Sequence, residues 1–271
     1  MKCIHAVCVA LVAALGVGCA PARSGAVVSP TASTSPGKAG SMARFIAHRD
    51  HLYALDGSRL IVYDTAFFGL PREVHRIHVP AAAETLFPYG ELLFVGTRQG
   101  MLVYSVVTPA EPELIGRADH VYSCDPVVVE DDVAYVTLRS GAGCRQGVSM
   151  LLVYDVRSPT EPRQISGLPL ASPHGLGVDG DVLFVADAVH GLLVLDVREP
   201  HDPKPLAMLP EVVGYDLIAD DGLLFVSAED GLYQYAYDQE GLTGLPVSRI
   251  PIGESKGERP PPEAMAPSQG M

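Results

Sequence analysis

Residues 192–203, LLVLDVREPHDP, decide the fold: an apolar run, an aspartate, a short polar stretch and two prolines. Residues 151–162 repeat the pattern as LLVYDVRSPTEP. Related apolar runs begin at residues 60, 101 and 232, so the starts of the five runs are separated by 41, 50, 41 and 40 residues. Self-similarity with a period of about 40 residues is typical of repeat architectures.

A second apolar run precedes each of these runs and reports the same period. It reads LYAL at 52, LLFV at 92, VAYV at 133, VLFV at 182 and LLFV at 223, with separations of 40, 41, 49 and 41 residues. The two series of runs are independent, and both place an insertion in the third repeat.

Each repeat contains four segments typical of strands. In the fourth repeat these are residues 175–178, 182–186, 192–197 and 205–209, with an Asp/Gly turn at 179–181. Short turns between apolar β-rich runs predict antiparallel hairpins. The second and third strands are apolar on both faces and need cover on both sides. The proline pair stops the third strand before an outer strand. We therefore predict an all-β fold: a five-bladed β-propeller of four-stranded antiparallel blades.

The runs at 151–162 and 192–203 resemble the L-x-V-Y-D-V-x-x-P-x-x-P pattern of the LVIVD-repeat family of bacterial and archaeal surface proteins. The resemblance covers residues 43–253, and residues 123–129, 134–140 and 173–177 are similar to a subgroup of the family. It implies a β-propeller of unestablished biochemical role. The fifth repeat, LYQYA at 232–236, lacks both the aspartate and the proline pair. This is expected of a terminal unit, and it leaves the mode of ring closure open.

The N-terminus is typical of an export signal. After Lys2, residues 6–15 (AVCVALVAAL) are uncharged and too short to span a bilayer, so residues 1–18 are predicted to be a signal peptide. No other segment approaches a spanning length, and the body is expected to be soluble. Residues 15–19, LGVGC, resemble a bacterial lipoprotein processing site, which implies a lipid on Cys19.

The match to that processing site departs at one position, because Gly16 stands where leucine is preferred. The alternative is ordinary cleavage after Ala22 in the small-x-small sequence of residues 20–22. Ala20, directly after the cysteine, favours by resemblance the outer membrane of a Gram-negative cell. The protein is thus expected to be periplasmic or at the cell surface, and to meet the membrane through its N-terminal lipid.

Residues 19–42 and 254–271 are predicted to be a disordered tether and a disordered tail, because segments so rich in Pro, Ser and Gly cannot bury enough apolar surface to order. The formal net charge of −13 argues against nucleic acid or anionic lipid headgroups as the main partner. High net charge also serves solubility. The chain has no nucleotide-binding loop and no G-x-S-x-G motif, so no cofactor is implied.

Cys124 and Cys144 are predicted to form a disulfide, since they are the even pair left in an exported chain beside Cys19. Cys124 stands where the first strand of the third repeat begins, and the antiparallel second strand ends near Leu138. The two cysteines therefore lie at the same end of one hairpin. The bridge would close the base of the insertion at residues 139–149 and stabilise by about 3 kcal/mol. The alternative is a redox or metal-binding thiol pair, for which a second ligand pair is lacking.

A candidate binding face follows from the position seven residues before each second-strand hairpin. The five equivalent residues are polar or amphipathic, and the insertion is expected to hang over the same channel mouth: Arg44, Glu84, Asp125, His174 and Tyr215, with Arg139 and Arg145 from the insertion. Binding concentrates in loops on a rigid framework.

Two alternatives to a binding face are open at these positions. The ring residues could pair with one another, Arg44 with Glu84 and Asp125 with His174, because polar groups near an axis need partners. Glu84, Asp125 and His174 on successive blades could also hold a divalent metal, although no local ligand motif supports this.

The predicted function is a cell-envelope lipoprotein that presents the propeller as a binding or scaffold module, with a protein or polysaccharide partner at the channel mouth. The alternative is a propeller enzyme, a hydrolase or lyase acting on a cell-wall or extracellular polymer, which would need acid/base carboxylates at the mouth. The aspartate pairs at 131–132 and 220–221 are poor candidates, because aspartate favours the turns in which they fall. A third possibility is a structural spacer.

Overall fold

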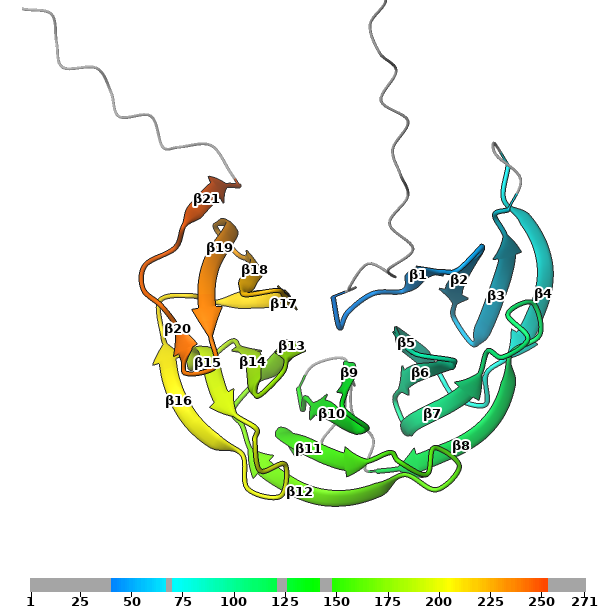
Figure 1. The fold of residues 1–271 in the computed structure, drawn as a ribbon, viewed down its shortest axis with the longest axis horizontal. Helices are drawn as coiled ribbons and strands as arrows, with labels where there is room; N and C mark the ends of the chain where they lie inside the picture. Colours follow the sequence, from blue (N-terminus) through cyan, green and yellow to red (C-terminus); the bar gives the residue numbers. More distant parts are fainter. Residues whose placement is uncertain (1–39, 67–69, 121–125, 142–147, 253–271) are drawn as a thin grey trace, which may run out of the picture. The chain divides into compact units, whose positions relative to one another are not determined.

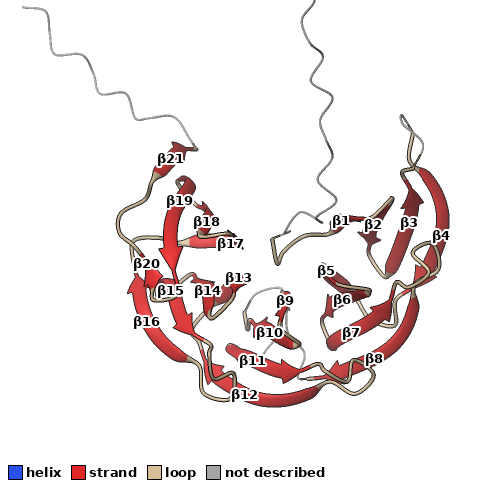
Figure 2. Cartoon of the chain, in the orientation of Figure 1, coloured by secondary structure: helices blue, strands red, loops and turns tan. Residues whose placement is uncertain are grey.

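The computed structural model describes residues 40–66, 70–120, 126–141 and 148–252, all within the unit Ser35–Met271. Across these ranges the regular structure consists of strands and contains no helix (Figure 2). No described segment is therefore a helix long and apolar enough to cross a membrane.

The strands form five antiparallel sheets, each built from one continuous stretch of chain (Figure 1). The first four sheets have four strands each, in chain order, as the repeats predict. The fifth has a fifth strand, because both β20 and β21 pair with β19. The bounds, sheet by sheet, are β1 (Phe45–His48), β2 (His51–Asp56), β3 (Arg59–Asp64), β4 (Arg72–His78); β5 (Ala83–Tyr89), β6 (Leu92–Thr97), β7 (Gly100–Ser105), β8 (Glu113–Asp119); β9 (Val127–Glu130), β10 (Val133–Leu138), β11 (Met150–Asp155), β12 (Arg163–Pro169); β13 (Pro173–Asp179), β14 (Val182–Asp187), β15 (Gly191–Asp196), β16 (Lys204–Leu209); and β17 (Gly214–Asp220), β18 (Leu223–Ala228), β19 (Gly231–Asp238), β20 (Gly241–Leu242), β21 (Ser248–Pro251).

Within each sheet the first strand is innermost and the fourth outermost, so that β1, β5, β9, β13 and β17 gather on the inside (Figure 1). Neighbouring inner strands contact each other from the first sheet through to the fifth. This arrangement is consistent with a β-propeller.

The turns between first and second strands follow the predicted chemistry. Between β9 and β10, Asp131 and Asp132 have φ values of 48° and 59°, and Asp221 and Gly222 have φ values of 47° and 76° between β17 and β18. Positive φ at both central residues is the conformation of a type I′ hairpin turn. The pair 131–132 thus occupies the turn, as the sequence predicts, whereas of the pair 220–221 only Asp221 does and Asp220 ends β17.

In the second, third and fourth sheets the second and third strands are largely buried on both faces, because each of these sheets has a neighbour on either side (Figure 1). The second strands of the first and fifth sheets, β2 and β18, are only partly buried. In β14 every residue is buried. Leu183 and Val185 belong to an apolar cluster shared with the third sheet, while Phe184 and Ala186 belong to one shared with the fifth. Successive side chains of a strand point to opposite faces, so one apolar strand serves two interfaces.

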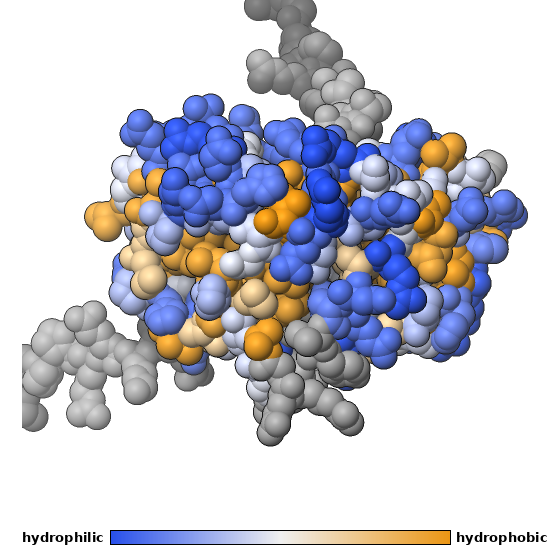
Figure 3. Space-filling view, turned by 90° about the horizontal axis from the view of Figure 1, so that it is seen from below, coloured by the Kyte–Doolittle hydropathy of each residue, from blue (hydrophilic) through white to orange (hydrophobic). Residues whose placement is uncertain are grey.

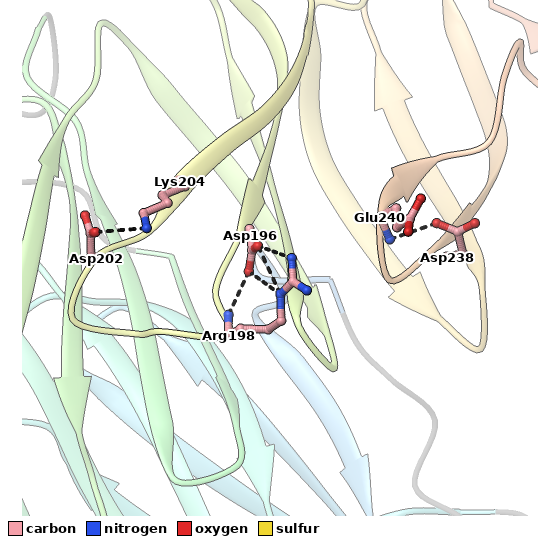
Figure 4. A network of polar contacts seen from close by, with 6 residues as sticks. All are labelled: Asp196, Arg198, Asp202, Lys204, Asp238 and Glu240. Atoms are coloured by element: carbon pink, nitrogen blue, oxygen red, sulfur yellow. Dashed lines mark hydrogen bonds and ion pairs between the residues drawn. The ribbon is translucent and has the colours of Figure 1, made fainter.

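An aspartate ends the third strand of the first, third and fourth sheets and has a local structural role there, whereas β7 ends at Ser105. Asp155 Oδ1 accepts a hydrogen bond from the Arg157 amide at 3.1 Å, and Asp196 Oδ1 accepts one from the Arg198 amide at 3.0 Å (Figure 4). This is an Asx turn, which leads the chain out of the strand.

The fifth repeat keeps this turn although its sequence departs from the pattern. The expected aspartate position holds Ala236, but β19 runs two residues further, to Asp238. Asp238 Oδ1 accepts a hydrogen bond from the Glu240 amide at 2.8 Å (Figure 4). The terminal repeat therefore differs in strand length rather than in turn chemistry.

The outer strands are covered on one side only, and their composition reflects this. In Figure 3, which views the molecule from below Figure 1, hydrophilic residues are interspersed with apolar ones. Leu114 on β8 and Met208 on β16 are examples of exposed apolar side chains. Such a mixed pattern is ordinary for a half-solvated strand.

A short segment ahead of β1 joins the fifth sheet to the others. We call residues 40–43 the axial segment. The Ser41 hydroxyl donates to Asp216 Oδ1 of β17 at 3.2 Å and accepts from the Leu176 amide of β13 at 2.8 Å. The Met42 amide also donates to Asp216 Oδ1, at 3.3 Å.

The other end of the axial segment is tied to the second sheet, because the Leu86 amide donates to the Ala43 carbonyl at 2.8 Å. The segment thus contacts the second, fourth and fifth sheets. Its first residues, Gly40 and Ser41, are buried, although the sequence places them at the end of the tether. On the first sheet Phe45 of β1 stays 69% exposed.

Candidate functional site

The equivalent positions singled out in the sequence lie at the start of the inner strands. Arg44 directly precedes β1, and Glu84, His174 and Tyr215 are the second residues of β5, β13 and β17. Asp125 lies outside the described residues. Four of the five predicted positions are therefore placed, and all four are at the same end of an inner strand.

A β-bulge occurs at three of these positions. The pairing of β5 with β6 shifts between Ala83 and Thr85, so that Glu84 is the extra residue. The pairing of β17 with β18 shifts in the same way around Tyr215, and that of β13 with β14 shifts between Pro173 and Leu176, which brackets His174. A bulge redirects the side chain that it carries, and bulges are frequent beside functional sites.

Three of these residues and one residue of the insertion meet in a single pocket of about 200 Å³. Tyr215 is not part of its lining, but its ring lies 6.0 Å from that of His174, edge to face. Arg145 lies outside the described residues. The lining consists of Met42, Arg44, Glu84, Thr85, Pro126, Arg139, Pro173 and His174.

The pairing of Arg44 with Glu84, one of the two that the sequence suggests, is not formed, and the other, Asp125 with His174, involves a residue outside the described ranges. Glu84 Oε1 accepts from Arg98 Nε at 2.6 Å, so Glu84 is paired with Arg98 rather than with Arg44. Arg98 lies in the turn between β6 and β7 of the same sheet. Arg44 is exposed, and within the described part of the chain its guanidinium makes no hydrogen bond or ion pair. Among the described residues of the lining, Arg44 is therefore a cation without a matching anion.

His174 is held from both sides of its ring. Its Nδ1 lies 3.1 Å from the Ser172 carbonyl oxygen, which can only accept, so Nδ1 carries the proton. Its Nε2 is in contact with Arg139 Nη1, which can only donate, so Nε2 accepts. Burial lowers the pKa of His174 below 6.5, and the Arg139 charge lowers it further, against the hydrogen bond to the Ser172 carbonyl.

We expect His174 to be the neutral Nδ1–H tautomer at pH 7 and to gain a proton only below pH 6.5. Long-range ¹⁵N–¹H NMR spectra of the imidazole would check this. Replacing Arg139 by Gln should raise the pKa of His174, because it removes a nearby cation. A charged His174 at pH 7 in the wild type would contradict the assignment.

A buried carboxylate supports the backbone next to His174. Asp187, at the end of β14, is 1% exposed, and its Oδ2 accepts from the Ala171 and Ser172 amides at 3.1 and 2.9 Å. The Ser172 carbonyl in turn binds the His174 ring. Asp187 thus holds the residue that orients His174.

Asp187 is not among the site residues predicted from the sequence. The equivalent last residue of the second strand is neutral and buried in three sheets, as Thr97, Leu138 and Ala228, and is the exposed Asp56 in β2. What distinguishes Asp187 is a buried charge, which requires hydrogen-bond partners and which the residue type alone does not reveal.

The insertion is closed at its base by a hydrogen bond between described residues. The hydroxyls of Ser140 and Ser149 lie 3.0 Å apart, and the Ser140 amide also donates to Ser149 Oγ at 3.2 Å. Cys124 and Cys144 lie outside the described residues, so the disulfide stays a prediction.

Two of the three side chains suggested as metal ligands lie in the described part of the chain. Glu84 and His174 both line the pocket, but Asp125 lies outside the described ranges. Across those ranges no group of three or more His, Cys, Asp or Glu side chains is placed to hold a metal ion.

Comparison with known proteins supports the fold class. No family model matches the chain, and no curated protein sequence does. Solved structures do match: a functionally unknown protein from Desulfotomaculum acetoxidans (TM-score 0.59, 12% identity, 72% of this chain and 65% of that one), the periplasmic gluconolactonase of Pseudomonas aeruginosa (0.58, 16%, 75% and 68%) and a protein from Lactobacillus plantarum (0.59, 15%, 75% and 69%).

These similarities, at such low identity, concern the fold alone. Together with the five antiparallel sheets, they place the chain among the β-propeller-like proteins. The chain spans less than two thirds of the length of the first of these structures and slightly more than two thirds of the other two.

Proposed function

We propose that this protein is an exported, lipid-anchored module of the bacterial cell envelope, of the LVIVD-repeat type. Its five-bladed propeller binds a ligand in the pocket at the inner strands, and no turnover of the ligand is required. The ligand is a small molecule or one unit of a larger polymer, such as a polysaccharide or protein at the cell surface.

One observation carries the binding role. Residues far apart in the sequence but equivalent in the repeats, Arg44, Glu84 and His174, converge on one pocket together with Arg139 from the insertion. A pocket with an apolar lining and a few convergent polar groups is the usual form of a ligand site. Purely structural ring residues would pair with one another, whereas Arg44 is exposed and unpaired among the described residues.

The envelope location is supported by the sequence. Residues 1–18 have the form of a signal peptide, Cys19 follows a lipoprotein-like processing site, and the residues after it are typical of a tether. The similar structure from Pseudomonas aeruginosa is a periplasmic protein by its name, which agrees with an exported propeller. Ala20 favours the outer membrane.

Mass spectrometry of the native protein from a membrane fraction tests the anchor. We expect the mature N-terminus to be a lipidated Cys19, and Cys124 and Cys144 to be joined by a disulfide. An unmodified N-terminus at Arg23, from cleavage after Ala22, would contradict lipidation. Free thiols at Cys124 and Cys144 would contradict the bridge.

Cross-linking in intact cells tests the binding role. A partner captured by the wild-type protein should be lost when Arg44 and His174 are both replaced by Ala. The matched control replaces Arg72 and His75, an Arg and a His exposed on the outer strand β4. If the cross-linked partner is lost from both double variants, or from neither, the pocket is not the binding site. Turnover of a captured ligand would favour the enzyme alternative.

A further inference from the structure

We propose that the pocket selects a small hydroxylated monocarboxylate, the chemistry of a uronic acid. This deepens the proposed function and rests on it, because it assigns the ligand class of the same pocket. The assignment follows from Arg44, Glu84 and the apolar lining.

The first step concerns charge. The chain has a formal net charge of −13, yet the described residues of the lining carry two guanidinium groups and one carboxylate, and that carboxylate is already paired with Arg98. Arg44 has no intramolecular anion among the described residues. A guanidinium matches a carboxylate or a phosphate in a bidentate arrangement. An anionic group is therefore the ligand feature that Arg44 recognises.

The second step separates a carboxylate from a phosphate. Glu84 lies in the same pocket, and only its Oε1 is engaged by Arg98. Its other oxygen has no hydrogen-bond donor among the described residues and can accept one from a hydroxyl group. The same carboxylate repels a second negative charge, so it disfavours a phosphate dianion beside Arg44. A monoanion that also carries hydroxyl groups satisfies both residues.

The third step concerns size and shape. A volume of about 200 Å³ is below the ~300–1,000 Å³ typical of pockets for drug-sized ligands, so the ligand, or the part of it that enters, is small. Met42, Pro126 and Pro173 supply apolar surface in the lining. Such surface suits the C–H face of a sugar ring.

Isothermal titration calorimetry with a matched set of probes tests this inference on the full mature chain. The probes are D-glucuronate, D-glucose, D-glucose 6-phosphate and acetate, each at millimolar concentration. The three sugars share a ring and differ at one carbon, which carries a carboxylate, a hydroxyl or a phosphate. We expect D-glucuronate to bind at least tenfold more tightly than the other three, and more weakly as ionic strength rises.

Variants assign the selectivity to residues. Arg44→Gln should weaken D-glucuronate binding by about tenfold or more, the usual loss for a charge-assisted hydrogen bond, and Arg117→Gln on the outer strand β8 should change nothing. Glu84→Gln should narrow the gap between D-glucuronate and D-glucose 6-phosphate, because the repelling charge is gone.

The outcomes separate this inference from the proposed function. Equal binding of D-glucose and D-glucuronate, lost in His174→Gln but not in Arg44→Gln, would overturn the ligand class and leave the pocket as a site. Binding of no probe would also overturn the ligand class, and the cross-linking experiment would then decide the binding role by itself.

Discussion

The Asp187→Ala variant is expected to lose about 4 kcal/mol of the free energy of unfolding, measured by urea titration at pH 7. The Asp187 side chain is 1% exposed and accepts four backbone hydrogen bonds. Two come from residues 171 and 172 and two from residues 189 and 190. Alanine leaves these part-buried amides without their carboxylate acceptor, and a lost hydrogen bond to a charged group costs about 1.5–3 kcal/mol. The loss is smaller for the amides of the exposed residues 189 and 190, which can turn to water.

The loss should also appear as a lower melting temperature, by roughly 8–16 °C, because each kcal/mol corresponds to about 2–4 °C in a domain of this size. The matched control is Asp202→Ala. Asp202 is an exposed aspartate whose only ion pair, with Lys204 at 3.4 Å, is solvent-exposed within the described structure (Figure 4). It should change stability by less than about 0.5 kcal/mol. Equal effects of the two variants would contradict the role of Asp187.

The pH dependence of stability provides a second test. Burial alone raises the pKa of Asp187, but the four backbone N–H donors outweigh it and the net pKa is lowered below 3.8. The stabilisation is therefore complete above about pH 4 and is lost as pH falls through the depressed pKa. The acid limb of the wild-type stability curve should flatten in Asp187→Ala.

The fold could be predicted because it depends on patterns that recur. The apolar runs that begin at Val182 and Leu192 have to be covered on both faces, and the turn at Asp179–Asp181 joins them to the inner strand. The fourth-sheet strands accordingly begin and end within two residues of the predicted bounds. The number of strands in the fifth sheet was not predictable from the repeat, because β20 and β21 lie beyond its last motif.

The site was predictable in its positions but not in its contacts. The repeat period alone predicts that Glu84 and His174 stand at equivalent positions at the start of inner strands. It does not predict the β-bulges, because a bulge changes the local register of strand pairing without changing the spacing of apolar residues. The hydrogen-bond partners Arg98 of Glu84 and Ser172 of His174 depend on the side-chain directions that the bulges set, so the sequence could not predict them either.

The axial segment is a contact of another kind that no local pattern encodes. Ser41 and Asp216 are 175 residues apart in the chain, and Ser41 lies in a stretch whose composition is typical of a tether. Gly40 shows how close the approach is, since a Cβ there would lie 2.2 Å from Asp216 Oδ2. Composition describes a segment on its own, whereas this one is ordered by what it binds.

Asp216 should therefore respond in opposite ways to two substitutions. Asp216→Ala is expected to lose about 2 kcal/mol, because the Ser41 hydroxyl and the Met42 and Leu217 amides all donate to its Oδ1. Asp216→Asn keeps an oxygen at that place and removes the charge. Burial raises the pKa of the Asp216 carboxyl, although these hydrogen bonds lower it, so the ionised form is costly in the folded protein.

Asp216→Asn should thus be at least as stable as the wild type at pH 7. In the wild type the cost of the buried charge falls as pH decreases from the raised pKa toward the ordinary value of 3.8, and this gain in stability should be absent in Asp216→Asn.

The control is Asp220→Ala, which replaces an exposed aspartate on the same strand and should change the free energy of unfolding little. Because Met42 of the axial segment and Arg44 directly after it line the pocket, Asp216→Ala should also weaken ligand binding while Asp216→Asn preserves it. Destabilisation of both variants to the same degree would mean that the charge itself, rather than the acceptor, holds the segment.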